Sequence, residues 1–128
     1  MVLGIDFGLK RIGLAVADEN LAQPLVVVAN SLGMIDQILE ICQQQKIKKI
    51  IIGLPEGRLV KKIKEFSQKL QEITGLPIEF QDETLTSEDA LDMMIKIGKK
   101  KKAREEKKDA FAAAIILQEY LKRSPKNV

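Results

Sequence analysis

The sequence predicts an α/β fold, a mixed five-stranded sheet in the spatial order 3-2-1-4-5 with helices on both faces. Two observations support it. Three short apolar segments with short connections fill the first thirty residues, which favours an antiparallel meander. The apolar period then changes to that of amphipathic helices separated by two further apolar strands. A chain of 128 residues is long enough for one hydrophobic core, and no linker interrupts it. We therefore expect a single domain over 1–128, with a flexible tail over about 123–128.

Five segments have the composition of strands. We expect these strands at residues 2–7, 12–17, 25–28, 47–54 and 77–81. The first strand is followed by Gly8. The third begins directly after Pro24, and a proline suits the start of a strand. The fourth contains Ile50-Ile51-Ile52, a β-branched run typical of a central strand buried on both faces.

Four segments show helical spacing. We expect helices at residues 35–45, 59–73, 86–97 and about 104–121. Gly75 and Pro77 end the second, and Thr86, with Asp89 three residues later, offers a cap for the third. In the last helix Ala112, Ala113 and Ala114 lack bulk, so this helix can approach the sheet closely.

Composition excludes several kinds of chemistry. The chain has no His and only one Cys, Cys42, so an internal disulfide, a Cys/His zinc site and His-based catalysis are excluded. No apolar run reaches the roughly 18–20 residues that cross a bilayer. The N-terminal segment has an acid where a signal peptide would be apolar, so we expect a cytoplasmic protein with no membrane partner.

Positive charge is concentrated near the C-terminus. Residues 1–95 hold 10 Lys/Arg and 14 Asp/Glu, a net of −4, whereas residues 96–128 hold 11 and 4, a net of +7. This block is either a solvated loop or a surface that attracts phosphates. The candidate nucleic-acid-binding residues are Lys10, Arg11, Lys99, Lys100, Lys101, Lys102, Arg104, Lys107 and Lys108. Because aromatic residues make up only 4%, recognition of a duplex or junction by its backbone and shape fits better than base stacking.

Three acidic positions stand out. Asp6 interrupts an apolar strand, and either binds a cation or caps the turn toward Lys10. Asp82-Glu83 follows the fifth strand at an edge where α/β sheets commonly bind ligands, and we expect Glu83 to point inward. Asp109 lies on the sheet-facing stripe of the last helix, although an acid there also suits the helix dipole. Together they would repel one another unless a divalent ion lay between them, which favours Mg²⁺ or Mn²⁺ and phosphodiester hydrolysis.

Four blocks of the sequence together closely resemble the YqgF/RuvX family. They are Gly4 to Gly13 (GIDFGLKRIG), Ile52 to Pro55 (IGLP), Asp82 to Ser87 (DETLTS) and Lys108-Asp109 with the alanine-rich residues up to Gln118. The resemblance implies an RNase H-like fold and a bacterial cytoplasmic, metal-dependent nuclease, linked to 5′-end maturation of the 16S ribosomal RNA precursor and to Holliday-junction resolution. Carried over by position, the family's acidic set falls on Asp6, Glu83 and Asp109.

The sequence departs from the family pattern at two places. Thr84 follows Glu83 where the family usually has an arginine, and the segment after Pro55 is shorter than usual before Gly57. Neither change removes a carboxylate, but both bear on how the substrate is held.

Other functions remain as alternatives. The enzyme would act on structured RNA or on branched DNA, as a monomer or a homodimer, with ribosomal precursor particles as possible partners.

An ATP-binding module of the actin and sugar-kinase type also begins with D-x-G, but the chain lacks a second such motif. A non-catalytic RNA-binding assembly factor would use only the basic surface of the same scaffold.

Overall fold

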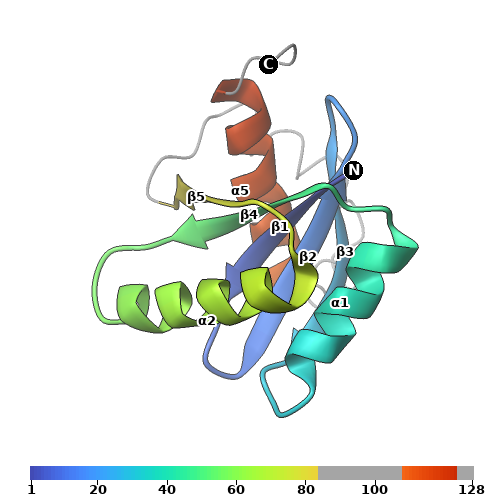
Figure 1. Cartoon of the computed structure of the whole chain (residues 1–128). Helices are drawn as coiled ribbons and strands as arrows, with labels where there is room; N and C mark the ends of the chain where they lie inside the picture. The colour runs from blue at the N-terminus through green and yellow to red at the C-terminus, as the bar shows by residue number, and fades with distance from the viewer. Residues whose placement is uncertain (84–107, 124–128) are drawn as a thin grey trace.

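The computed structural model describes residues 1–83 and 108–123, and the sheet is built in the expected order. Five strands lie in the order β3-β2-β1-β4-β5. The described elements are β1 (Val2–Phe7), β2 (Arg11–Ala17), β3 (Ala22–Ala29), α1 (Met34–Gln44), β4 (Lys49–Leu54), α2 (Leu59–Thr74), β5 (Ile78–Asp82) and α5 (Lys108–Arg123). Helices α1 and α2 cover one face of the sheet and α5 covers the other (Figure 1). The predicted mixed sheet with helices on both faces is therefore confirmed.

Strand direction decides where side chains of the predicted site can meet. β1 pairs antiparallel with β2 and parallel with β4, and β4 pairs parallel with β5. The carboxyl ends of β1, β4 and β5 consequently share one edge of the sheet, which we call the carboxyl edge. Asp6 near the end of β1 and Glu83 just after β5 both lie at this edge.

The third strand differs from its predicted bounds. β3 is longer than predicted, because it begins at Ala22 and contains Pro24 rather than starting after it. An edge strand tolerates proline because its outer N–H groups need no partner in the sheet, and β3 is at the edge. The predicted helix at 86–97, the start of the last helix before Lys108, and the tail beyond Arg123 lie outside the described residues.

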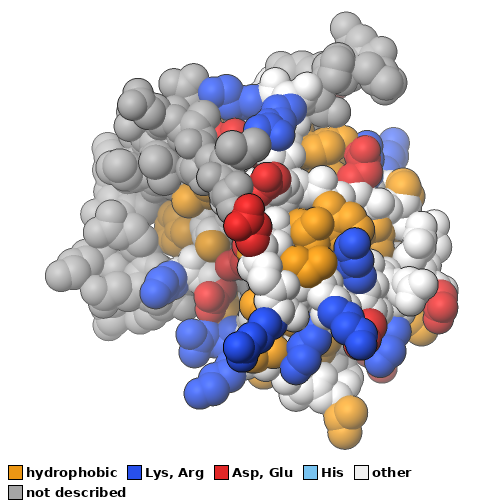
Figure 2. All heavy atoms as spheres, turned by 90° about the vertical axis from the view of Figure 1, so that its left-hand side faces the viewer, with side chains coloured by type: hydrophobic (Ala, Val, Ile, Leu, Met, Phe, Trp, Pro, Cys, Tyr) orange, Lys and Arg blue, Asp and Glu red, His pale blue; other side chains and the backbone are white. Residues whose placement is uncertain are grey.

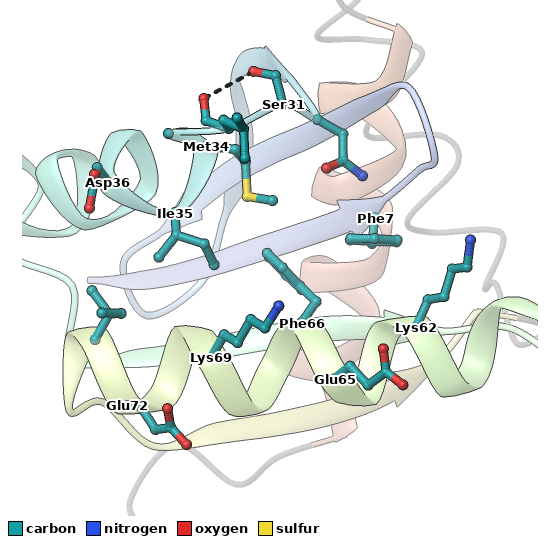
Figure 3. A pocket seen from close by; sticks show the side chains of 14 residues that line it. Phe7, Ser31, Met34, Ile35, Asp36, Lys62, Glu65, Phe66, Lys69 and Glu72 are labelled. Carbon is teal, nitrogen blue, oxygen red and sulfur yellow. Dashed lines mark hydrogen bonds between the residues drawn. The ribbon is translucent and has the colours of Figure 1, made fainter.

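The larger core lies between the sheet and the two helices α1 and α2. Its fully buried members include Leu3, Ile5, Ile38, Ile52 and Leu70, which alternate along strands or recur at helical spacing as the sequence predicts. A cavity of about 580 Å³ opens between α1 and α2 beside the packed rings of Phe7 and Phe66 (Figure 3). None of the described helices is both long and apolar enough to cross a membrane.

The layer of side chains between the opposite face of the sheet and α5 is unusually thin, because small residues of the strands lie under this helix. A Cβ added to Gly13 would stand 1.9 Å from the carbonyl oxygen of Asp109, and one added to Gly4 would stand 2.8 Å from Cβ of Leu117. Ala113 and Ala114 of α5 are fully buried against this face. Glycine on the strands and alanine on the helix thus let the two backbones come almost into contact, as the alanine run predicts.

Two polar contacts hold α5 in register on the sheet. The Gln118 side chain accepts a hydrogen bond from the N–H of Ala22 at 2.9 Å and donates one to the carbonyl oxygen of Asn20 at 3.1 Å. The Tyr120 hydroxyl donates to Glu79 at 2.8 Å and accepts from the Lys49 ammonium at 2.6 Å, while Lys49 also forms an ion pair with Glu79. These contacts fix the position of α5 at both its β2–β3 and its β4–β5 sides.

We predict that Gln118→Ala lowers the free energy of unfolding by about 1–3 kcal/mol, because the buried N–H of Ala22 loses its partner. Gln71→Ala, the same change at an exposed position of α2, should alter it by less than about 0.5 kcal/mol. Urea denaturation followed by circular dichroism measures both. Equal effects of the two substitutions would show that Gln118 does not anchor the helix.

Candidate active site

The structure brings Asp6 and Glu83 together beneath α5. Asp6 alternates with the core residues Ile5 and Phe7 on β1, so its side chain faces α5 rather than the larger core. The N–H of Glu83 donates to the carbonyl oxygen of Leu54 at 3.3 Å, which extends the β4–β5 pairing by one residue and turns Glu83 inward. The carboxyl groups of Asp6 and Glu83 share a hydrogen bond.

A glycine makes room for this pair. Gly53 lies opposite Gln81 on the neighbouring strand, on the face toward α5. A Cβ at Gly53 would stand 2.7 Å from Oε1 of Glu83 and 2.5 Å from Cδ1 of Ile116. Any larger residue would therefore push Glu83 away from Asp6 or lift α5 from the sheet.

Burial and neighbouring acids make Asp6 hard to ionise. Removal from water raises the pKa of Asp6, and the hydrogen bond and negative charge of Glu83 raise it further, with a smaller contribution from Asp109. The pKa reaches about 8, compared with 3.8 for an ordinary aspartate. Without a cation, Asp6 therefore keeps its proton at neutral pH.

Asp109 stands at the start of α5 with a partner of its own. Its carboxylate accepts a hydrogen bond from Nε of Arg11 at 2.9 Å, and the two form an ion pair. The Asp109 side chain is 27% exposed and that of Arg11 is 64% exposed, so this pair lies at the surface. Arg11 thus neutralises the third acid, which lies within electrostatic range of Asp6.

A cavity of about 340 Å³ opens beside the acidic pair. It is lined by Asp6, Asp82, Glu83, Ala112, Ile115, Ile116 and Glu119. Over residues 1–83 and 108–123, no three acidic or Cys side chains approach closely enough to enclose a metal ion. The structure therefore unites two of the three predicted acids and leaves Asp109 at the rim beside Arg11.

The donor set nevertheless fits a hard divalent cation. Two carboxyl groups in contact supply oxygen ligands, and an ion between them would replace the proton that Asp6 otherwise retains. The small residues around them leave space on the cavity side, where Ala112 contributes only a methyl group. The chemistry of the two carboxyl groups thus fits a hard divalent cation.

The predicted nucleic-acid contacts are only partly described. Lys10, Arg11 and Lys108 are exposed near the acids. Lys99, Lys100, Lys101, Lys102, Arg104 and Lys107 lie outside the described residues, as does Thr84. Figure 2 looks onto the carboxyl edge, where acidic side chains lie beside a gathering of Lys and Arg side chains.

Two buried polar residues at the site, Gln81 and Glu119, are not among the predicted site residues. Glu119 is 6% exposed and lines the acidic cavity, and Gln81, 5% exposed, has no partner for its Nε2 among the described residues. Glu119 lies in the second half of α5, where polar and apolar residues are mixed, so the sequence gives no signal that this acid is buried. Gln81 could have been found, because it alternates with Glu79 and Glu83 on one face of β5.

We predict that Asp6→Asn stabilises the metal-free protein, because asparagine carries no charge to desolvate. Between pH 4 and 8 the folded protein keeps a proton on Asp6 that the unfolded chain releases, so wild-type stability falls as pH rises through this range. The variant lacks this loss. Its advantage should grow from pH 5 to pH 8, where we expect about 2 kcal/mol, or roughly 8 °C in melting temperature.

Thermal denaturation in EDTA at the two pH values measures this difference. Asp36→Asn, the same change at an exposed position of α1, serves as the control and should show no growing advantage. A constant difference between Asp6→Asn and wild type at both pH values would contradict the raised pKa.

Comparisons with known proteins agree with this fold and show the family. The family model described as "RuvX: Holliday junction resolvase" matches residues 1–123. A relative from Protochlamydia amoebophila, provisionally named a pre-16S rRNA nuclease, is 38% identical over 137 residues, which cover 94% of this chain and 91% of the relative. A relative from Sulfurihydrogenibium with the same provisional name is 39% identical over 132 residues, with 95% and 90% covered.

Solved structures show the same fold at much lower identity. Thermus thermophilus RuvC, solved in complex with a Holliday junction substrate, superposes with a TM-score of 0.67 at 20% identity, covering 95% of this chain and 94% of that one. The fowlpox virus Holliday junction resolvase gives a TM-score of 0.63 at 13% identity, covering 96% and 99%. The sheet order and the family match over nearly the whole chain lead to one conclusion: this protein belongs to the RuvX family and has the RNase H-like fold of the RuvC-type resolvases.

Proposed function

We propose that this protein is a metal-dependent nuclease that hydrolyses phosphodiester bonds in the 5′-end processing of the 16S ribosomal RNA precursor. The observation that carries the proposal is the contact between Asp6 and Glu83 at the carboxyl edge, in a chain of a nuclease family. The provisional names of the relatives support the RNA substrate.

Asp6 and Glu83 are the residues proposed to hold Mg²⁺ or Mn²⁺, and Asp109 is the third proposed ligand. When bound, such an ion activates water and stabilises the charge on the leaving oxygen. Asp109 would be free to hold the ion if Arg11 released the Asp109 carboxylate and bound a substrate phosphate instead, since a guanidinium binds both groups. Lys10 and Lys108, exposed on the same side, would attract the phosphate backbone.

A second candidate is the resolution of branched DNA. The description of the matching family favours it. Cleavage of a four-way DNA junction faster than of a precursor rRNA fragment would favour this candidate over RNA processing. Precursor ribosomal particles as partners, a cytoplasmic location and the monomeric or dimeric state remain predictions from the sequence.

We predict that Asp6→Asn and Glu83→Gln each lower metal-dependent cleavage by at least about 10³-fold, because each removes a charged ligand oxygen. Asp36→Asn should keep wild-type activity. Cleavage of a labelled 16S precursor fragment with Mg²⁺ or Mn²⁺ measures the rates, and circular dichroism confirms the fold. Full activity of Asp6→Asn would overturn the assignment, and salt-sensitive binding without cleavage by the wild type would favour the non-catalytic assembly factor.

We also predict that Mn²⁺ raises the melting temperature of the wild-type protein and not that of Asp6→Asn. A ligand that binds the folded state at 100 times its Kd stabilises it by about 2.7 kcal/mol. Melting curves over a Mn²⁺ titration test this independently of catalysis. An equal shift in both proteins would place the ion elsewhere.

A further inference from the structure

A second basic surface lies on the outer flank of α2, away from the lysine block near the C-terminus. A groove of about 720 Å³ runs between this flank and β5. Among the described residues, its polar and aromatic lining consists of Arg58, Lys61, Lys64, Gln68 and Phe80, together with Ser67 and one acid, Glu65. We call this surface the α2–β5 groove.

No ion pair among residues 1–83 and 108–123 neutralises the cations of the groove. Five of the ten Lys/Arg residues before residue 96 lie between Arg58 and Lys69. Both ion pairs found among the described residues involve other cations, Arg11 and Lys49. The ammonium groups of Lys61 and Lys64 and the Arg58 guanidinium are therefore available to an anionic partner.

The two flanks of α2 differ in charge, which argues against an ordinary solvated helix. Along the opposite flank, Lys62 and Lys69 share the cavity beside Phe66 with Glu72, with Asp36 of α1, and with Glu65, which also lines the α2–β5 groove (Figure 3). In the α2–β5 groove three cations face one acid. The excess positive charge is thus confined to the flank that faces β5.

The spacing of the three cations suits one strand of nucleic acid. Arg58, Lys61 and Lys64 are separated by three residues each, so they rise by about 4.5 Å per step along one side of α2. A single row of cations can follow one phosphate backbone, whereas a nucleic-acid duplex presents two phosphate backbones to a protein. The row begins at the start of α2, directly after the carboxyl end of β4.

Phe80 supplies the second half of a single-strand site. It lies on β5, an edge strand, and its side chain is 39% exposed in the groove. Exposed aromatic rings beside cations are the platforms on which unpaired bases stack. Phe80 lies on the α2 face of β5, whereas Glu83, three residues later, lies on the α5 face. Because β5 is an edge strand of the described sheet, a nucleic-acid strand stacked on Phe80 can reach the acidic pair by passing around this edge.

We propose that the α2–β5 groove binds a single-stranded flank of the nucleic-acid substrate, with Arg58, Lys61 and Lys64 on its phosphates and Phe80 under one base. This inference rests on the proposed nuclease function, because the acidic pair defines where the strand leads. It assigns the substrate a paired part at the active site and an unpaired extension along α2.

The test measures binding in the full-length protein with Asp6→Asn present throughout, so that no cleavage is needed. Fluorescence anisotropy compares a blunt duplex with the same duplex carrying a ten-nucleotide single-stranded flank, each prepared as RNA and as DNA. The groove pair Lys61→Gln/Lys64→Gln is compared with the control pair Lys62→Gln/Lys69→Gln, which removes equal charge from the opposite flank of the same helix.

We expect the groove pair to weaken binding of the flanked probe by about tenfold and to reduce the slope of log affinity against log salt by about 1.4, the value for two single-strand phosphates. The control pair should change it less than twofold. Phe80→Leu should weaken the flanked probe by about fivefold or more and leave the blunt duplex unchanged. A stronger effect on the RNA or the DNA probe identifies which nucleic acid the groove prefers.

Equal losses from the two lysine pairs, or equal losses on blunt and flanked probes, would overturn the proposal. Those results would mean that the charges act only as a general attraction. Because these measurements need no catalysis, they separate failure of the groove from failure of the nuclease assignment, which the Asp6→Asn and Glu83→Gln cleavage rates decide.

Discussion

The contact of α5 with the bare backbone of the sheet is the constraint on which the site depends. Gly4 and Gly13 lie where any side chain would collide with α5, and Gly53 lies where one would collide with Glu83 and Ile116. Close approach is stabilised by the fully buried alanines of the helix and by the Gln118 hydrogen bonds. Because α5 cannot move outward without breaking these contacts, it keeps the carboxyl groups beneath it partly shielded from solvent.

The exclusion of solvent from Asp6 and Glu83 affects the stability of the protein. A carboxylate loses hydration when it is buried, and a second carboxylate beside it adds repulsion, so the Asp6–Glu83 pair lowers the stability of the metal-free protein at neutral pH. Stability that is given up at one position is typical of sites kept for function. The burial and repulsion that destabilise the pair without a cation would favour binding of one, because a bound cation would remove the repulsion.

The sequence predicts the framework well and the contacts around it less well. Alternating and helical periodicity locate the strands and the first two helices, and the alanine run correctly predicts a helix close to the sheet. Asp6 and Glu83 are also predicted, because acids at strand ends break the apolar pattern. The Arg11–Asp109 ion pair joins residues 98 positions apart, and no local pattern encodes such a pairing. Phe80 likewise has an apolar identity that predicts burial, yet the edge position of β5 leaves it exposed.

In the proposed site, folding prepares Asp6 and Glu83, with Asp109 nearby, to share one divalent cation. A crystal structure of the protein soaked in Mn²⁺, with anomalous scattering to locate the metal, tests this most directly. We expect an anomalous peak between the carboxylates of Asp6 and Glu83, with Asp109 turned from Arg11 toward the ion. A peak bound elsewhere, with Asp6 and Glu83 still joined by their hydrogen bond, would contradict the account.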